Sequence, residues 1–255
     1  MTHEPRPATP VGRMVGATAC TTACALAGAL LISLSAAAAT LGPLVGEGDA
    51  PAPPWLFAGL PQQSLPRTQY RIAPVDAGRA LRIEANGSYG NLVHAMPAGS
   101  SGRRLAWRWR LDQPNALADL RRKPGDDSAV KVCLLFDHAL SAVPFIERQL
   151  LRLARSSTPE PLPAATVCYV WDVRLAGGDA VDNAYSRRVR YLVLRGAEAP
   201  LRQWATEQRD VAADFLRLFG DETTVVPPLL AVAVAGDADN TKARSLAWVD
   251  ALTLD

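Results

Sequence analysis

Two acidic loops hold the side chains best suited to chemistry. One carries Asp126 and Asp127 just before an apolar strand, and the other carries Asp237, Asp239 and Asn240. Carboxylate and amide oxygens in such loops bind calcium ions or accept hydrogen bonds from sugar hydroxyls. The same residue types also stabilise tight turns by bonding their own backbone amides, so a purely structural role stays open. If both loops lie at one end of the same pair of sheets, they predict a ligand-binding site there.

Asp237 and Asp239 are the expected ligands if the protein holds a structural calcium ion. An EF-hand loop that started at Asp237 would need glycine at its sixth position and glutamate at its twelfth, where the chain has Lys242 and Trp248. The loop is therefore not an EF-hand, and a calcium ion would take further ligands from the other acidic loop. We expect no other cofactor.

Motifs of catalysis are scarce in this chain. Beyond the N-terminal segment only His94 and His138 remain as histidines, and no zinc-binding H-x-x-x-H or C-x-x-C spacing occurs. The nearest match to a nucleophile elbow, the tetrapeptide from Gly87 to Gly90, lacks the G-x-S-x-G spacing. A pair of carboxylates would still suffice to cut a glycosidic bond, one as acid and one as base or nucleophile. The sequence favours a protein without catalysis, and the alternative is an enzyme that uses two of the following carboxylates: Asp126, Asp127, Asp172, Asp237 and Asp239.

Aromatic side chains offer a second way to hold a sugar, because sugar rings pack against exposed tryptophan faces. Trp107 and Trp109 alternate with arginine along one predicted strand, and Trp171 lies on another, so we expect these three in the core. Trp204 follows a loop instead and is the aromatic residue that we expect at a binding surface.

Basic residues are spread through the chain and leave little net charge. The 27 Lys and Arg side chains against 25 Asp and Glu give a formal charge of +2, which argues against a nucleic-acid partner. Arg104, Arg108, Arg110 and Lys131 are expected on strand surfaces, where arginine either meets an anionic group bidentately or simply faces solvent.

The elements that must position these residues are short strands. Turn sequences such as Asn86-Gly87 and Gly177-Gly178 separate them, and their spacing predicts a mostly β, two-layer antiparallel β-sandwich of the jelly-roll kind. The expected strands are 80–85, 104–111, 128–136, 166–171, 188–195, 229–235 and 243–254.

Two segments break the strand pattern and predict short helical additions. Pro144–Arg155 begins with a proline that suits a first helical turn. Asp210–Phe219 places apolar residues near one stripe and is followed by Gly220, a good helix stop.

The N-terminus predicts export. No charged residue occurs from Met14 to Gly46, and a short apolar core precedes the small residues Ala36–Ala39, where we expect a signal peptidase to cut. The competing reading is that residues 14–39 stay as a membrane anchor, since the uncharged run exceeds the roughly 20 residues that span a bilayer. We divide the chain into a signal or anchor (1–39), a proline- and glycine-rich linker (40–54) and one β-sandwich domain (55–255).

Cleavage would also change the cysteine count. Cys20 and Cys24 would leave with the signal, and Cys133 and Cys168 would remain as an even pair in an oxidising compartment. A disulfide between them and two buried free thiols are the two alternatives.

Several stretches carry a resemblance to a known family. They are Trp107-Arg108-Trp109-Arg110, Gly125-Asp126-Asp127 and the segments 162–171, 207–215 and 236–241. On these stretches the chain from about Trp55 to its C-terminus resembles the bacterial domain-of-unknown-function family 3047, whose members are predicted to be exported and have no assigned activity. The family tends to have arginine where Lys131 stands and threonine where Gly236 stands. The segment 247–254 is also similar to the last strand of galactose-binding-like jelly rolls, which implies the same sandwich.

Together these features predict an exported protein of the periplasm or cell envelope. Our leading hypothesis is a non-catalytic, carbohydrate-binding-like module whose partner is a polysaccharide or other glycan. The alternatives are a carboxylate-dependent glycan-active enzyme and a structural envelope protein without a small ligand. The membrane would be a partner only through an uncleaved N-terminal segment, and the sequence leaves the oligomeric state undetermined.

Overall fold

The computed structural model describes residues 40–60, 62–156 and 162–255. Contacts divide the chain into two units, Met1–Ser35 and Ala36–Asp255, and all described residues belong to the second. The predicted signal or anchor lies outside the described residues. Within the described part of the chain, no helix is long and apolar enough to cross a membrane.

The larger sheet has seven strands and is antiparallel except for one pair. Its order is β1-β4-β11-β6-β7-β9-β8, and only β7 and β9 run parallel. The strands are β1 (Leu56–Ala58), β4 (Asn91–Ser100), β6 (Lys131–Phe136), β7 (Ala165–Trp171), β8 (Ala180–Asp182), β9 (Val189–Arg195) and β11 (Leu229–Ala235).

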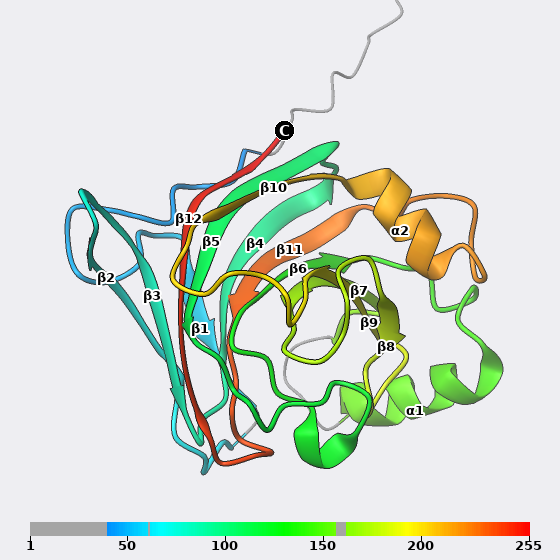
Figure 1. The fold of residues 1–255 in the computed structure, drawn as a ribbon. Coiled ribbons are helices and arrows are strands. Elements are labelled where there is room, and N and C mark those ends of the chain that lie inside the picture. Colours follow the sequence, from blue (N-terminus) through cyan, green and yellow to red (C-terminus); the bar gives the residue numbers. More distant parts are fainter. Residues whose placement is uncertain (1–39, 61, 157–161) are drawn as a thin grey trace, which may run out of the picture. The chain divides into compact units, whose positions relative to one another are not determined.

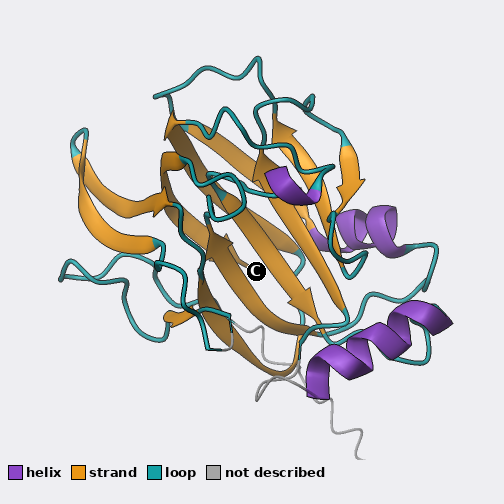
Figure 2. Ribbon diagram, turned by 90° about the horizontal axis from the view of Figure 1, so that it is seen from below, coloured by secondary structure: helices purple, strands orange, loops and turns teal. Residues whose placement is uncertain are grey.

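The smaller sheet has five strands and is antiparallel throughout. Its order is β10-β5-β12-β3-β2. The two sheets face each other, and the β2–β3 hairpin projects from the sandwich (Figures 1 and 2). The strands are β2 (Gln69–Val75), β3 (Gly78–Asn86), β5 (Arg104–Gln113), β10 (Ala205–Asp210) and β12 (Arg244–Leu254).

The predicted fold class is confirmed: two sheets form a sandwich with two helices, α1 (Phe145–Ser156) and α2 (Val211–Phe219), and a short 3-10 turn at Lys123–Gly125. The parallel pair is a departure from the expected pattern, and it arises because the chain between β7 and β9 returns to the starting end through β8. The expected strands also omitted β1, β2, β4, β8 and β10. In β4, Pro97 and Gly99 weaken the strand pattern, and they lie where the pairing with β11 shifts register between Leu229 and Ala231.

Part of the predicted linker, residues 40–54, contacts the sandwich. Leu44 is 3% exposed and belongs to the core. Trp55 donates its Nε1 proton to the carbonyl of Gly42 at 3.1 Å, and the backbone nitrogen of Gly42 donates to His94 Nε2 at 3.0 Å. Most of the remaining residues of this segment are exposed or half-buried.

An aromatic layer joins the two sheets. Trp107 and Trp109 of β5 point inward and meet Tyr169 and Trp171 of β7, with ring centroids 5.3 Å apart for Trp107–Tyr169 and 5.7 Å for Trp109–Trp171. Side chains of this size bury the most apolar area per residue. The expectation that the strand tryptophans lie in the core agrees with their exposures, which are 3% or less.

The two helices cover different parts of the sandwich. Helix α2 begins at Asp210, whose carboxylate accepts a hydrogen bond from the backbone nitrogen of Ala213 at 2.9 Å, as expected of an N-cap. It presses Phe215 and Phe219 into the core, and the ring of Phe215 lies 4.6 Å from that of Phe136. Helix α1 buries only Leu151.

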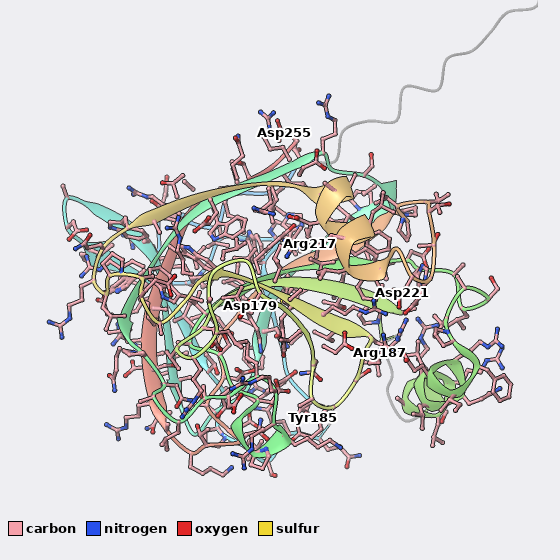
Figure 3. The ribbon with its side chains drawn as sticks, turned by 45° about the vertical axis from the view of Figure 1, so that its right-hand side comes forward. Asp179, Tyr185, Arg187, Arg217, Asp221 and Asp255 are labelled. Atoms are coloured by element: carbon pink, nitrogen blue, oxygen red, sulfur yellow. A yellow bond between two sulfur atoms is a disulfide. The ribbon has the colours of Figure 1, made fainter. Side chains whose placement is uncertain are left out.

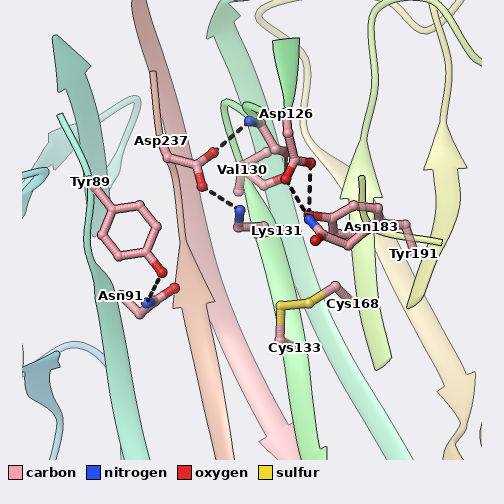
Figure 4. The surroundings of a disulfide bond; sticks show 11 residues. Tyr89, Asn91, Asp126, Val130, Lys131, Cys133, Cys168, Asn183, Tyr191 and Asp237 are labelled. Carbon is pink, nitrogen blue, oxygen red and sulfur yellow. Dashed lines mark hydrogen bonds and ion pairs between the residues drawn. A yellow bond between two sulfur atoms is a disulfide. The ribbon is translucent and has the colours of Figure 1, made fainter. Parts of the chain in front are cut away.

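Cys133 and Cys168 form a disulfide between neighbouring strands. They are directly opposed in the β6–β7 register and are separated by 35 residues in the chain (Figure 4). Both sulfur-bearing side chains point away from the aromatic layer, into a second apolar cluster with Leu120, Val170 and Tyr191.

Removing this disulfide should destabilise the domain. Replacing Cys133 and Cys168 together by alanine is expected to lower the free energy of unfolding by about 2–4 kcal/mol, because the unfolded chain regains the freedom that the cross-link removes. Urea unfolding followed by tryptophan fluorescence measures the loss. Reductant should bring the wild-type protein to the same midpoint, and an unchanged midpoint in both tests would contradict the expectation.

Candidate functional site

The two acidic loops meet at one end of the larger sheet. The first leads into β6, and the second follows β11, which is the neighbour of β6 in the sheet. The backbone nitrogen of Asp237 donates to the carbonyl of Ser128 at 2.9 Å, and the backbone nitrogen of Ser128 donates to Asp237 Oδ1 at 2.6 Å. Asp126, Asp127, Asp237, Asp239 and Asn240 therefore lie close together, which the sequence had left open.

A buried ion pair lies at the centre of this cluster. Lys131 Nζ is 2.5 Å from Asp237 Oδ2, and both side chains are nearly inaccessible (Figure 4). Burial alone would lower the pKa of Lys131. The charge of Asp237, to which Tyr191 and Asp126 add, has the larger effect and holds that pKa well above its usual value. Lys131 is therefore charged and is held by Asp237.

Asp126 and Asp127 are also buried, and each has its own hydrogen-bond partners. Asp126 Oδ2 accepts from Asn183 Nδ2 at 2.5 Å, and its Oδ1 accepts from the Tyr191 hydroxyl at 3.2 Å (Figure 4). Asp127 Oδ2 accepts from the backbone nitrogen of Thr241 at 2.8 Å and from its hydroxyl at 2.5 Å. The bonds of Asp127 tie the two acidic loops together, and those of Asp126 tie its loop to Asn183 and to β9. The role is structural, but the partners belong to other segments and are not the residues' own turn amides.

Asp239 differs from the other three carboxylates. It is only partly buried, and its Oδ1 is an enclosed oxygen with no hydrogen-bond partner among the described residues. Burial, and after it the charges of Asp237 and Asp127, raise the pKa of Asp239. Tyr185, 57% exposed, donates its hydroxyl proton to Oδ1 of Asn240, the residue that follows Asp239 in the chain, at 2.8 Å. Asp239, at the outer part of this cluster, therefore keeps its proton to a higher pH than an exposed aspartate does.

One of the two predicted calcium ligands, Asp237, is already engaged. Both carboxylate oxygens of Asp237 accept hydrogen bonds, one from Ser128 and one from Lys131. In the part of the chain that the structure describes, no group of three or more His, Cys, Asp or Glu side chains is placed to hold a metal ion. The calcium site at Asp237 and Asp239 stays a prediction, and Lys131 supplies the positive charge there.

Trp204 lies on a different surface, the outer face of the five-stranded sheet. Its Nε1 donates to Asp76 Oδ2 at 2.8 Å, and the guanidinium carbon of Arg108 lies 4.6 Å from the centre of its ring. Arg110 Nη1 reaches the same carboxylate at 3.1 Å. Asp76 stands in the β2–β3 turn with a φ of 50°, and the projecting hairpin brings it to Trp204. The hydrogen bond from Trp204 and the charge of Arg110 lower the pKa of Asp76.

A row of charged pairs continues on this face. Arg108 Nε donates to Asp250 at 2.9 Å, Arg110 Nε donates to Asp112 at 2.6 Å, and Trp248 Nε1 donates to Asp112 at 2.9 Å. We call the whole group the Trp204 surface; its members are Asp76, Arg108, Arg110, Asp112, Trp204, Trp248 and Asp250. Sequence reasoning placed Trp204 and both arginines at the surface but missed Asp76 and Trp248. The parity of β12, with Val249 in the core, was the signal for Trp248.

The Trp204 surface leads toward a polar hollow on the same sheet. Its volume is about 430 Å³, and Arg104 and Gln208 are on the same faces of β5 and β10 as Arg108 and Thr206. The lining residues are Arg103, Arg104, Gln208, Arg209, Asp210 and Asp255. Its side chains combine hydrogen-bond donors and acceptors.

A family model decides which group of proteins this chain belongs to. The model described as a protein of unknown function, DUF3047, matches residues 54–253, which is most of the chain and nearly all of the sandwich. The chain belongs to the DUF3047 family. No curated protein matches it. The Trp204 surface, the acidic loops and the disulfide of this DUF3047 protein all lie inside the matched region.

Breaking the buried ion pair of this DUF3047 protein should be costly. Lys131→Met leaves Asp237 buried and unpaired, so we expect a loss of about 3–5 kcal/mol in the free energy of unfolding. Adding Asp237→Asn should recover part of that loss, because the amide keeps the bond from Ser128 without the charge. Urea unfolding of the two single variants and the double variant measures the coupling. Strictly additive losses would contradict an ion pair.

The proton on Asp239 should make stability depend on pH. Because the folded-state pKa is raised, the folded chain keeps this proton to a higher pH than the unfolded chain; the linked stability is present at low pH and is lost as the pH rises through the raised pKa. Asp239→Asn should therefore raise the unfolding temperature by about 1–3 °C at about pH 8 and leave it unchanged at about pH 3. Thermal melts at both pH values test this, with Asp49→Asn, 90% exposed, as the control. An equal shift at both pH values would contradict it.

Proposed function

We propose that this protein is an exported, non-catalytic glycan-binding module of the periplasm or cell envelope, and that the Trp204 surface is its binding site. The observation that carries the proposal is the combination of a half-buried tryptophan ring with arginine and aspartate side chains on the outer face of the five-stranded sheet. Sugars are recognised by this combination, because their C–H faces pack on an aromatic ring and their hydroxyls bond charged groups around it.

The polar groups of the Trp204 surface are held in place before any ligand arrives. Asp76 is bonded by both Trp204 and Arg110, and Arg108 is bonded to Asp250, so each side chain has one preferred orientation. Asp76 and Arg108 nevertheless remain 57% and 44% exposed, which leaves hydrogen-bonding capacity for a ligand. Prior ordering of this kind lowers the entropy cost of binding.

The backbone under the site is rigid, since Arg108, Arg110 and Trp248 stand on the paired strands β5 and β12. The hollow at Arg104 and Gln208 lies farther along the same sheet. A polymer, unlike a single sugar, would be long enough to contact both.

Export is supported by two features. The uncharged N-terminal run has the character of a secretory signal. The Cys133–Cys168 disulfide suits an oxidising compartment, where such bonds form and persist.

Catalysis receives less support from the acidic loops. Asp126, Asp127 and Asp237 are buried and accept hydrogen bonds from neighbouring loops, so they serve as ties between those loops. Only Asp239 combines partial exposure with a raised pKa. A glycosidase would need a second accessible carboxylate opposite it.

A glycan array followed by calorimetry on envelope polysaccharides tests the proposal. Trp204→Ala should weaken binding about tenfold or more, and Arg108→Ala should also weaken it, since each removes part of the platform. The matched control is Arg121→Ala, which removes an exposed arginine paired with Asp119 on another surface.

Three results would count against the proposal. An array signal no higher than background would rule out a glycan as the ligand. Binding that is lost in Asp239→Ala and Tyr185→Ala but kept in Trp204→Ala would move the site to the acidic loops. Turnover of a polysaccharide that Asp239→Ala abolishes would replace the binding module by the carboxylate-dependent enzyme.

A further inference from the structure

Helix α1 turns most of its large apolar side chains toward solvent. Phe145, Ile146, Leu150 and Leu153 are 65%, 72%, 61% and 70% exposed. Ile146, Leu150 and Leu153 recur at the four- and three-residue spacing that places side chains on one helical face. Such a row of exposed apolar residues on one short helix marks an interaction surface. We call these four residues the α1 apolar face.

The opposite side of the helix holds it against the domain. Leu151 packs with Val143 and Ala164 in a small buried cluster. Glu147 pairs with Arg188, and its Oε1 also lies 3.6 Å from Arg187 Nη1. Arg187 is labelled in Figure 3, where it lies near Asp221. Arg188 in turn reaches the buried Glu222 at 2.5 Å. These contacts orient α1, so its apolar face points outward as a result of the fold.

The charges that remain on α1 are all positive. Its one acidic residue, Glu147, is taken up by the two arginines of the domain. Arg148 packs over the ring of Phe145 at 5.7 Å, Arg152 bonds Gln149 at 3.3 Å, and Arg155 bonds the carbonyl of Leu162. Within residues 40–60, 62–156 and 162–255 none of these three pairs with an acid, so this part of the chain presents an apolar face and, beside it, arginines without an acidic partner.

We propose that α1 binds the surface of a membrane that contains anionic lipids, lying in the plane of the interface with its apolar face among the acyl chains. Helices with arginine on one side and phenylalanine and leucine on the other bind membranes in this way, and anionic headgroups attract the arginines. Twelve residues make a helix of about 18 Å, which is too short to cross a hydrocarbon core of about 30 Å.

The charges favour a membrane over a second copy of the chain. In a two-fold symmetric dimer the same patch meets itself. Such a dimer would cover the apolar residues, but α1 offers no free acid to pair with the arginines of a second copy, because Glu147 pairs with Arg188. An anionic surface instead satisfies the apolar residues and the arginines at once.

Vesicle binding of the full chain tests the proposal. The probes are vesicles of phosphatidylcholine with phosphatidylglycerol and vesicles of phosphatidylcholine alone. The triple variant Ile146→Glu, Leu150→Glu and Leu153→Glu should sediment with the anionic vesicles about tenfold more weakly than wild type. The matched control puts three glutamates at Leu56, Leu117 and Val225, which are 71%, 62% and 71% exposed elsewhere on the domain, and it should bind nearly as wild type does. Arg148→Gln with Arg152→Gln should remove the preference for phosphatidylglycerol.

A readout local to α1 separates this helix from the N-terminal segment. Phe145→Trp places a fluorophore on the apolar face, and brominated phosphatidylcholine in anionic vesicles should quench its emission beyond the quenching of the native tryptophans. Absence of this extra quenching would overturn the proposal, as would equal sedimentation of the wild type and the triple variant. A lipid-free dimer that the triple variant dissociates, with vesicle binding unchanged, would assign the face to a second copy instead. Thermal melts confirm that each variant is folded.

Discussion

The packing of four aromatic rings between the two sheets is the contact on which the rest of the structure depends. Trp107 and Trp109 from β5 meet Tyr169 and Trp171 from β7, so neither sheet can bury its inner face without the other. The polar atoms on two of these rings find charged partners: Trp109 donates to Glu207 at 2.9 Å and Tyr169 to Asp214 at 3.0 Å. Arg195 and Arg209 pair with those carboxylates, so the layer carries no uncompensated charge.

Because side chains alternate along a strand, this inner layer also dictates what the two outer faces present. With Trp107 and Trp109 inside, Arg108 and Arg110 must stand outside, next to Asp250 and Asp112 on the neighbouring β12. With Val132 inside, Lys131 and Cys133 face the opposite surface, where they meet Asp237 and Cys168. The Trp204 surface and the Lys131–Asp237 ion pair thus lie on opposite sides of one core, each on the side of its sheet that faces away from the aromatic layer.

The proposed glycan surface and the proposed membrane helix are compatible within one protein. The Trp204 surface belongs to the five-stranded sheet, whereas α1 is attached to the domain through Glu147, Arg188 and Glu222 near the edge of the seven-stranded sheet. A module that rests on a membrane by one element and binds a polysaccharide by another would link the two layers of a cell envelope. The acidic loops serve a third purpose, holding the turns at one end of the sandwich.

The sequence by itself determined the sandwich and the two helices, because strand alternation, capping residues and turn chemistry are local signals. The approach of the two acidic loops was decided by tertiary structure, since the residues that join them are more than 100 positions apart. Lys131 as the partner of Asp237, and Asp76 as the partner of Trp204, were decided only by tertiary structure. Those residues are 106 and 128 positions apart, and no local pattern records a contact over such a separation. Burial of Leu44 and exposure of the α1 apolar face likewise depend on which other elements cover them. The type of a residue sets whether its side chain is more stable when buried, and the fold decides whether another element lies there to cover it or to pair with it.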